Sequence, residues 1–269
     1  MKHGVGVIGF GGEGYWQARH VLVSDYLELV GVSDINEKCS EYAAEKSMKF
    51  YESNEALLAD PAIDLVIIAT PNDSHKSLAL AAMAAGKNVV CEKPVTMNSA
   101  ELAEMIEASE KYRKLFTVYQ NRRWDGDFLT AKKIVDENRL GEISRIESRV
   151  HGSRGIPGDW RQLPEHGGGM ILDWGVHLLD QVLMLKGQIK LKYVYASVFN
   201  ITNQLVDDGF TAMLTFEDGM EVLVEVGTSN FISLPRWYIV GQNGTALIRD
   251  WTSGAEIVSA AGIDEHDVC

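Results

Sequence analysis

Short apolar runs alternate with amphipathic helical segments through the first 120 residues of this 269-residue chain. The run Leu65–Ala69 is apolar throughout, which is typical of a parallel strand covered on both faces. Helical segments separate the runs, as the crossover connections between parallel strands require. The alternation predicts an α/β Rossmann domain, a doubly wound parallel sheet, over residues 1–122.

The second half of the chain follows a different pattern. A Gly/Pro-rich loop at 151–169 precedes a helix, and strands then follow one another through tight turns. Two of these turns contain Asp218-Gly219 and Asn243-Gly244, dipeptides that favour hairpin connections. We therefore expect residues 123–269 to form a substrate-binding α+β domain with a mostly antiparallel sheet.

Composition excludes several classes of partner. The formal charge of −13 argues against nucleic acid and anionic membranes, whose binding requires clusters of Lys and Arg. The three cysteines Cys39, Cys91 and Cys269 have neither metal-site spacing nor an even number, so we expect reduced thiols and no metal. We expect a cytoplasmic protein, because no signal peptide precedes the first strand and no apolar run is long enough for a bilayer.

A glycine-rich turn follows the first strand. Gly9-Phe10-Gly11-Gly12-Glu13-Gly14 matches the G-x-G-x-x-G pattern and opens a helix, whose N-terminus can bind a pyrophosphate. Asp34 follows the second strand, where a carboxylate accepts hydrogen bonds from the ribose and repels a 2′-phosphate. The pattern predicts NAD binding, with NADP possible because Lys38 lies close to Asp34.

The turn after the run Leu65–Ala69 contains Thr70-Pro71-Asn72, with His75 three residues later. Two interpretations remain open. Pro and Asn favour turns and helix starts, so the segment can be purely structural. Alternatively, these groups lie along the nicotinamide half of the cofactor, and His75 is then a cofactor neighbour without a catalytic role.

The tripeptide Glu92-Lys93-Pro94 follows the next strand. In a doubly wound sheet this strand end faces the crevice that binds cofactor and substrate. Lys93 is therefore a candidate for stabilising a developing alkoxide by a charged hydrogen bond. Glu92 and Pro94 are interpreted as groups that position Lys93, and a cis bond before Pro94 is a further hypothesis.

A helix over 170–185 is predicted to carry Asp173, His177 and Asp180 on one stripe. Its other faces are apolar, so we expect the helix to be buried. A buried His177 suits proton transfer at neutral pH, and Asp173 can orient it or bind substrate. Asp180 is interpreted either as a group that supports the site residues from behind or as a hydrogen-bond partner between helix and loop. The alternative is a solvated Asp–His pair of little energetic value.

With these residues the chain resembles the Gfo/Idh/MocA family of NAD(P)-dependent sugar and polyol oxidoreductases. The resemblance runs from Val5 to about Arg249 and rests on Gly9–Gly14, Thr70-Pro71-Asn72 with His75, Glu92-Lys93-Pro94, Trp160-Arg161, Gly167–Gly169, and Asp173 with His177. It implies a catalytic set of Lys93, Asp173 and His177, which also contact the substrate. It implies too an open-faced sheet that forms a dimer or tetramer.

The segment from Tyr119 to Thr130 is similar to the inositol and scyllo-inositol dehydrogenase branch. This likeness implies that Asn121 lies near the cofactor and Arg122 near the substrate, while a salt-bridge cluster at a helix start is the alternative. Trp160 and Arg161 are candidates for the wall of the sugar pocket. The other interpretation of Trp160 is that its side chain anchors the loop by packing.

Two features depart from the family pattern. Gln17 stands where a histidine is often found, which puts one cofactor-side contact in doubt. The chain ends at Cys269, where family members usually continue, so we interpret it as a short variant or a truncated reading frame. Residues 260–269 are not expected to form a secondary-structure element.

The expected function is NAD-dependent interconversion of a hydroxyl and a ketone on a cyclic polyol or sugar, in which Lys93 and His177 assist proton transfer. Two alternatives remain: an NAD-dependent glycosidase that acts by transient oxidation, and a non-catalytic NAD(H)-binding regulatory protein.

Overall fold

The computed structural model of the chain describes residues 2–260. The chain divides into two compact units, Met1–Tyr119 and Gln120–Cys269, whereas the sequence places a boundary between residues 122 and 123. The expected tail beyond Ala260, including Cys269, lies outside the described residues. Across 2–260, no helix combines the length and the apolar character needed to cross a membrane.

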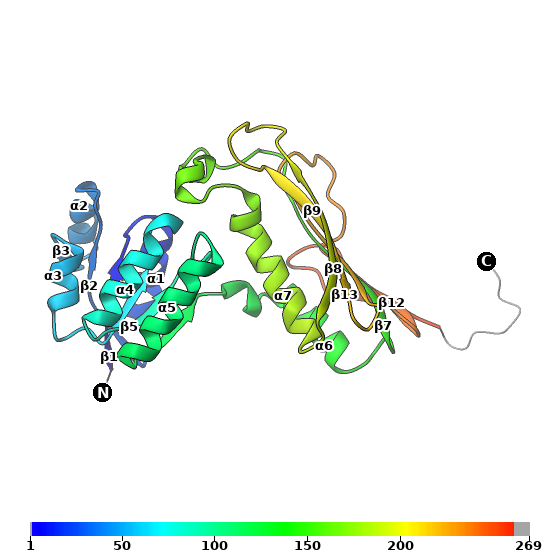
Figure 1. The fold of residues 1–269 in the computed structure, drawn as a ribbon, viewed down its shortest axis with the longest axis horizontal. Coiled ribbons are helices and arrows are strands. Elements are labelled where there is room, and N and C mark those ends of the chain that lie inside the picture. Colours follow the sequence, from blue (N-terminus) through cyan, green and yellow to red (C-terminus); the bar gives the residue numbers. More distant parts are fainter. Residues whose placement is uncertain (1, 261–269) are drawn as a thin grey trace, which may run out of the picture. The chain divides into compact units, whose positions relative to one another are not determined.

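The first unit is built on a six-stranded sheet (Figure 1). Its elements are β1 His3–Ile8, α1 Gly12–Leu22, β2 Leu27–Ser33, α2 Lys38–Glu45, β3 Phe50–Tyr51, α3 Asn54–Ala59, β4 Leu65–Ile68, the 3₁₀ helix η1 Asn72–Ser74, α4 His75–Ala84, β5 Asn88–Cys91, α5 Ser99–Tyr112 and β6 Phe116–Val118. The strand order is β3-β2-β1-β4-β5-β6, and every pairing is parallel. This order is the doubly wound arrangement, so the predicted Rossmann fold is confirmed.

Helices cover both faces of this sheet. On one face Val5 of β1 packs in a cluster with Ala18 of α1. On the other face Val66 of β4 packs with Met83 of α4 and Met105 of α5. Burial on both sides explains why the strands read as continuous apolar runs rather than as an alternation.

Side-chain caps mark where two helices of this unit begin. The Ser53 side chain accepts a hydrogen bond from the Ala56 N–H at 3.1 Å at the start of α3. Asn98 does the same for the Glu101 N–H at 3.0 Å at the start of α5. Such caps satisfy N–H groups that have no partner inside the helix.

The second unit contains a seven-stranded sheet. Its elements are η2 Asn121–Trp124, α6 Gly126–Asp136, β7 Ile143–His151, η3 Trp160–Gln162, η4 Pro164–His166, the π-helix η5 Ile171–Gly175, α7 Val176–Lys186, β8 Leu191–Phe199, β9 Gly209–Phe216, β10 Glu221–Gly227, β11 Trp237–Gly241, β12 Gly244–Ile248 and β13 Ala255–Ser259. Phe128 of α6 and Leu178 of α7 share one core with Val222 of β10 and Trp237 of β11. Helices α6 and α7 therefore pack against this sheet (Figure 1).

The sheet order is β13-β12-β11-β7-β10-β9-β8, and its pairings are antiparallel except for β7 with β10. The mostly antiparallel prediction is confirmed. The parallel pair could not be read from the sequence, because α7, β8 and β9 separate the two strands in the chain. Strand β13 was also not predicted, since its residues Ala255–Ser259 are partly or fully exposed and give no clear burial pattern.

The helix predicted over 170–185 differs from the structure in two respects. Residues Ile171–Gly175 form a π-turn, in which i→i+5 hydrogen bonds replace the i→i+4 bonds of an α-helix. The expectation of a fully buried helix is wrong for the last turn of α7, where Leu183 is 52% exposed and Met184 is 37% exposed.

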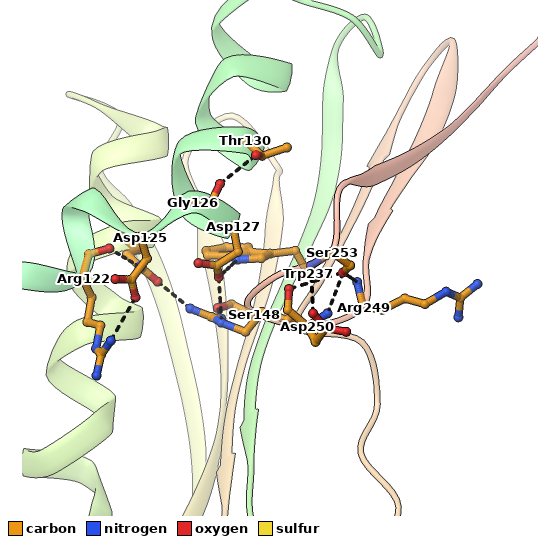
Figure 2. A network of polar contacts seen from close by, with 12 residues as sticks. Arg122, Asp125, Gly126, Asp127, Thr130, Ser148, Trp237, Arg249, Asp250 and Ser253 are labelled. Atoms are coloured by element: carbon orange, nitrogen blue, oxygen red, sulfur yellow. Dashed lines mark hydrogen bonds and ion pairs between the residues drawn. The ribbon is translucent and has the colours of Figure 1, made fainter.

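A buried ionic network joins α6, α7 and the sheet (Figure 2). Arg236 is only 3% exposed, and its Nε lies 3.1 Å from Asp127 Oδ2. Its two terminal nitrogens donate to Ser148 Oγ at 2.5 Å and to Gln181 Oε1 at 2.8 Å. Trp237 Nε1 donates to the same Asp127 oxygen at 2.9 Å. Burial lowers the pKa of Arg236 to about 10, and the neighbouring Asp127 opposes this shift.

We expect Asp127→Ala to lower the free energy of unfolding by about 3–5 kcal/mol, because it leaves the buried Arg236 charge without its partner. Denaturant titration of the purified variant provides the measurement. Asp136→Ala is the matched control, because Asp136 forms an exposed pair with Lys132 and such pairs contribute at most about 1 kcal/mol. Equal losses of unfolding free energy in the two variants would contradict the conclusion that Asp127 stabilises the buried Arg236 charge.

Candidate active site

The glycine turn lies between β1 and α1. Gly9 has φ +88°, and a β-carbon there would lie 2.6 Å from the Ala69 carbonyl oxygen. A β-carbon on Gly14 would lie 1.7 Å from the Gly9 carbonyl oxygen. By contrast, β-carbons on Gly11 and Gly12 would meet no atom within 4 Å, and no side chain caps the start of α1. The turn therefore fits a pyrophosphate held by backbone N–H groups at a helix N-terminus.

Asp34 ties the end of β2 to this glycine turn. Its Oδ2 accepts a hydrogen bond from the Phe10 N–H at 2.6 Å, and its Oδ1 accepts one from the Asn36 N–H at 2.8 Å. Each carboxylate oxygen can accept a further hydrogen bond, so a ribose hydroxyl can still bind. The Phe10 side chain is 2% exposed and belongs to the core, which leaves only its backbone available to a cofactor.

His75 links the turns that follow β4 and β5. It is fully buried, with Nε2 2.9 Å from the Thr70 carbonyl oxygen and Nδ1 2.9 Å from the Pro94 carbonyl oxygen. Burial lowers its pKa, and a neutral imidazole can donate to only one of the two carbonyls. Pro71 precedes η1 and Asn72 begins it. His75 therefore connects the turn after β4 with the turn after β5.

Glu92 and Lys93 follow β5. Glu92 is 7% exposed, and its Oε1 accepts a hydrogen bond from Gln17 Nε2 at 2.6 Å. Burial, assisted by the nearby Glu13 charge, raises the pKa of Glu92 to about 7. The Lys93–Pro94 peptide bond is cis, which confirms that hypothesis. Gln17, flagged as a departure from the family pattern, is therefore a direct partner of Glu92.

In the second unit, His177 lies in the first turn of α7 and is 4% exposed. Its Nδ1 is 3.1 Å from Gln120 Oε1, and its ring makes an edge contact with Trp174 at 5.8 Å between centroids. Asp180 accepts two hydrogen bonds from Arg123, at 2.7 and 2.6 Å. The predicted role of Asp180 between helix and loop is confirmed, and the solvated-pair alternative does not fit the burial of His177.

Asp173 lies in the π-turn and is largely buried. Its Oδ1 is 3.3 Å from Arg161 Nε, and the Arg161 guanidinium also donates to Asp159 Oδ2 at 2.8 Å. The same guanidinium stacks on the Trp160 ring at 4.6 Å. Trp160 thus supports Arg161, and Arg161 neutralises Asp173. π-turns are frequent at functional sites. Because Asp173 lies in one, the α-helical projection that placed it on one stripe with His177 and Asp180 does not describe its position.

A cavity of about 630 Å³ opens beside Asp173. Its lining includes Arg122, Trp174, Thr228 and Trp251. The Arg122 guanidinium lies over both indole rings, 5.1 Å from the centroid of Trp174 and 5.7 Å from that of Trp251. The structure therefore brings two predicted substrate residues, Arg122 and Asp173, to one cavity with two flat apolar surfaces.

Other predicted site residues lie elsewhere in the second unit. Asn121, Trp160, Arg161 and His177 are not among the residues that line this cavity. The Asn121 Oδ1 atom is buried and has no hydrogen-bond partner in the described part of the chain. It is thus an acceptor that a ligand N–H can satisfy.

Four residues of this region were missed by the sequence analysis: Gln120, Trp174, Asp207 and Trp251. The Asp207 carboxylate accepts hydrogen bonds from the Met170 and Ile171 N–H groups, both at 2.9 Å, and so caps the π-turn. Gln120 lies in the segment from Tyr119 to Thr130, and Trp174 lies in the helix predicted over 170–185, so both neighbour residues that were predicted for the site. For Asp207 and Trp251, no local spacing indicates the contact. Within residues 2–260, no group of three His, Cys, Asp or Glu side chains is arranged to hold a metal ion.

Comparison with known proteins identifies the family. Residues 3–120 match the family described as "Oxidoreductase family, NAD-binding Rossmann fold", and residues 128–247 match the "GFO/IDH/MocA C-terminal domain". The chain belongs to the GFO/IDH/MocA oxidoreductase family. The resemblance seen in the motifs is thereby confirmed, and the glycine turn has the open cradle that an NAD-binding domain needs.

Individual relatives support this assignment. The scyllo-inositol 2-dehydrogenase (NADP(+)) of Bacillus subtilis is 34% identical over 98% of this chain and 73% of its own. The crystal structure of an NAD-binding protein from Listeria innocua has a TM-score of 0.95 and 50% identity, covering 98% of this chain and 79% of that one. An uncharacterized oxidoreductase of Schizosaccharomyces pombe is 42% identical over 54% of this chain, which spans only 40% of that relative.

The raised pKa of Glu92 predicts a pH-dependent stability difference. A carboxyl whose pKa rises from 4.5 to about 7 on folding binds its proton more tightly in the folded state. Its stabilising contribution is complete below pH 4.5 and is lost as the pH rises through 7. The neutral variant Glu92→Gln escapes this loss. We expect its stability relative to wild type to increase by about 2–3 kcal/mol between pH 4.5 and 8.

Urea unfolding of the two proteins at both pH values measures this difference. Glu28→Gln provides the matched control, because it makes the same substitution at an exposed position of β2. If the difference in free energy of unfolding between wild type and Glu92→Gln stayed constant between pH 4.5 and 8, the raised pKa of Glu92 would be contradicted.

Proposed function

We propose that this protein oxidises a hydroxyl group of a cyclic polyol or sugar to a ketone, or catalyses the reverse reduction, with NAD. The cavity beside Asp173 carries the proposal. Its volume of about 630 Å³ lies within the range of small-molecule sites. Arg122 and Asp173 offer a donor and an acceptor for hydroxyl groups, while the indoles of Trp174 and Trp251 offer flat surfaces for the C–H faces of a ring. The name of the Bacillus subtilis relative supports the same substrate class.

The proposed chemistry uses Lys93, Asp173 and His177. A bound nicotinamide ring would accept the hydride that leaves the carbinol carbon. His177, whose ring contacts that of the cavity residue Trp174, would take the hydroxyl proton at Nε2. The Lys93 ammonium would stabilise the oxygen as negative charge develops on it. Asp173, neutralised in part by Arg161, would accept a hydrogen bond from a neighbouring substrate hydroxyl.

The cofactor preference is also proposed. The glycine turn and Asp34 would hold the pyrophosphate and the adenine-side ribose. The Asp34 carboxylate would repel a 2′-phosphate, which supports NAD over NADP. Lys38 and the NADP(+) in the name of the Bacillus subtilis relative are the features that favour NADP.

We expect Lys93→Ala and His177→Ala each to lower kcat/KM by at least about 100-fold, the usual scale for loss of an acid–base group, while NAD still binds. The assay follows absorbance of the reduced cofactor with inositols, aldoses and amino sugars, using NAD and NADP in parallel. Lys111→Ala and His20→Ala, both exposed, are the matched controls. Near-normal turnover in both variants would contradict the proposal.

The same assay separates the alternative functions. Continuous accumulation of NADH with a free polyol supports the dehydrogenase and contradicts a glycosidase that regenerates its cofactor at every turnover. Binding of NADH without turnover of any compound in the panel would support a regulatory protein instead.

We also propose that the sheet of the second unit mediates a homodimer or homotetramer. Strand β8 lies at the edge of the sheet and exposes a row of large apolar side chains. Tyr193 is 64% exposed, Val194 57% and Tyr195 71%. Exposed apolar edges of this kind favour association with another chain.

We expect Tyr195→Glu to reduce the mass of the assembly in solution, because a charge would then be buried in the interface. Analytical ultracentrifugation at micromolar protein concentration measures the mass. The matched control is Tyr26→Glu, which changes a tyrosine that is 78% exposed in the first unit. A wild-type monomer, or a Tyr195→Glu variant with unchanged mass, would contradict the proposed interface.

A further inference from the structure

We propose that Gln120 is a positioning residue that holds His177 in the tautomer with hydrogen on Nδ1, in which Nε2 is the basic nitrogen. The inference rests on the proposed function, in which His177 is the base. It starts from one contact, the 3.1 Å between Gln120 Oε1 and His177 Nδ1.

In the structure it is the amide oxygen of Gln120 that faces Nδ1, and an amide oxygen can only accept a hydrogen bond. The nitrogen that faces it must therefore carry the hydrogen, and the other ring nitrogen is then the basic one. His177 is 4% exposed, so water competes little for Nδ1. The reverse orientation of the Gln120 amide, with its nitrogen donating to Nδ1, would leave the hydrogen on Nε2.

Gln120 is held in place by contacts between η2 and α7. It directly precedes η2, and this turn is tied to the helix at two further points. Arg123 forms the paired hydrogen bonds to Asp180, and Gln181 Nε2 donates to the Arg122 carbonyl oxygen at 2.7 Å. His177, Asp180 and Gln181 are spaced i, i+3 and i+4, so one face of α7 makes all three contacts.

The buried network described above fixes Gln181 in turn. Its Oε1 accepts a hydrogen bond from Arg236, which is held by Asp127 and Ser148. These hydrogen bonds run from Ser148 of the sheet through Arg236 and Gln181 to the Arg122 carbonyl oxygen, two residues after Gln120. We infer that a polar network in the core of the second unit serves to orient one imidazole ring.

The partner of His177 is a neutral amide, although carboxylates lie close by. Asp180 is paired with Arg123, Asp173 with Arg161, and Asp125 with Arg122. A carboxylate at position 120 would favour the imidazolium and raise the pKa of His177, whereas the amide orients the ring without adding charge. Gln120→Leu removes the hydrogen-bond acceptor, whereas Gln120→Glu keeps an acceptor and adds a negative charge. The two variants therefore separate the effect of ring orientation from that of charge, at nearly constant side-chain volume.

The test uses ¹⁵N NMR of the full-length protein labelled at histidine, recorded with bound NADH at a pH where imidazoles are neutral. His177→Asn identifies the His177 signals by their disappearance. We expect Nδ1 to be protonated in the wild type and in Gln204→Leu, a matched control at an exposed loop position. Gln120→Leu should lose this preference, and Gln120→Glu should raise the pKa of His177 by about 1 unit or more.

Kinetics provide a second readout if a substrate is found. Gln120→Leu should lower kcat about tenfold or more with little change in KM, because the base spends less time in the productive tautomer. In Gln120→Glu, the acidic limb of the pH profile of kcat/KM should move upward by the shift that NMR reports. A purely structural role for Gln120 would not move that limb.

The outcomes distinguish this inference from the proposed function. Protonated Nδ1 in the wild type and its loss in Gln120→Leu support the positioning role even if no polyol is oxidised. A wild-type spectrum with hydrogen on Nε2, or an unchanged tautomer in Gln120→Leu, overturns the inference whatever the activity. If Gln120→Leu does not fold, Gln120→Glu decides the matter, since an unshifted His177 pKa overturns the contact.

Discussion

The common direction of β1, β4 and β5 determines where the functional groups of the first unit lie. Because the three strands are parallel and adjacent, their carboxyl ends meet at one edge of the sheet. Gly9, Thr70 and Lys93 each follow one of these ends. The Ala69 N–H donates to the Ile8 carbonyl oxygen, and His75 contacts the turns after β4 and β5, so the three segments are held together. Strand order thus brings these segments to the edge at which doubly wound sheets bind their ligands.

The second unit depends on a different kind of constraint. Burying a guanidinium as deeply as that of Arg236 costs free energy unless charged and polar partners compensate for the lost hydration. Its partners Asp127, Ser148 and Gln181 come from a helix, a strand and a second helix. These polar contacts add directional bonds to the apolar core that packs α6 and α7 against the sheet.

Prediction from sequence succeeded wherever the signal lay within a few residues. The alternation of strands and helices, the glycine turn and the hairpin dipeptides all act through local backbone geometry. It failed where the partner was distant or the geometry unusual. The contact of Gln120 with His177 joins residues 57 positions apart, and no spacing rule connects them. The π-turn at Ile171–Gly175 likewise cannot be read from apolar periodicity, because the segment runs directly into the α-helix α7.

The sequence by itself determined the Rossmann half, the family and the candidate ionisable groups Lys93, Asp173 and His177. These follow from residue type and short spacing, which act on the chain before it folds. Only the tertiary structure decided the parallel pairing of β7 with β10, the neutralisation of Asp173 by Arg161, and the placement of Gln120 against His177. Each of these is a contact between segments brought together by packing, and a linear pattern does not specify which distant side chain will occupy the space beside another.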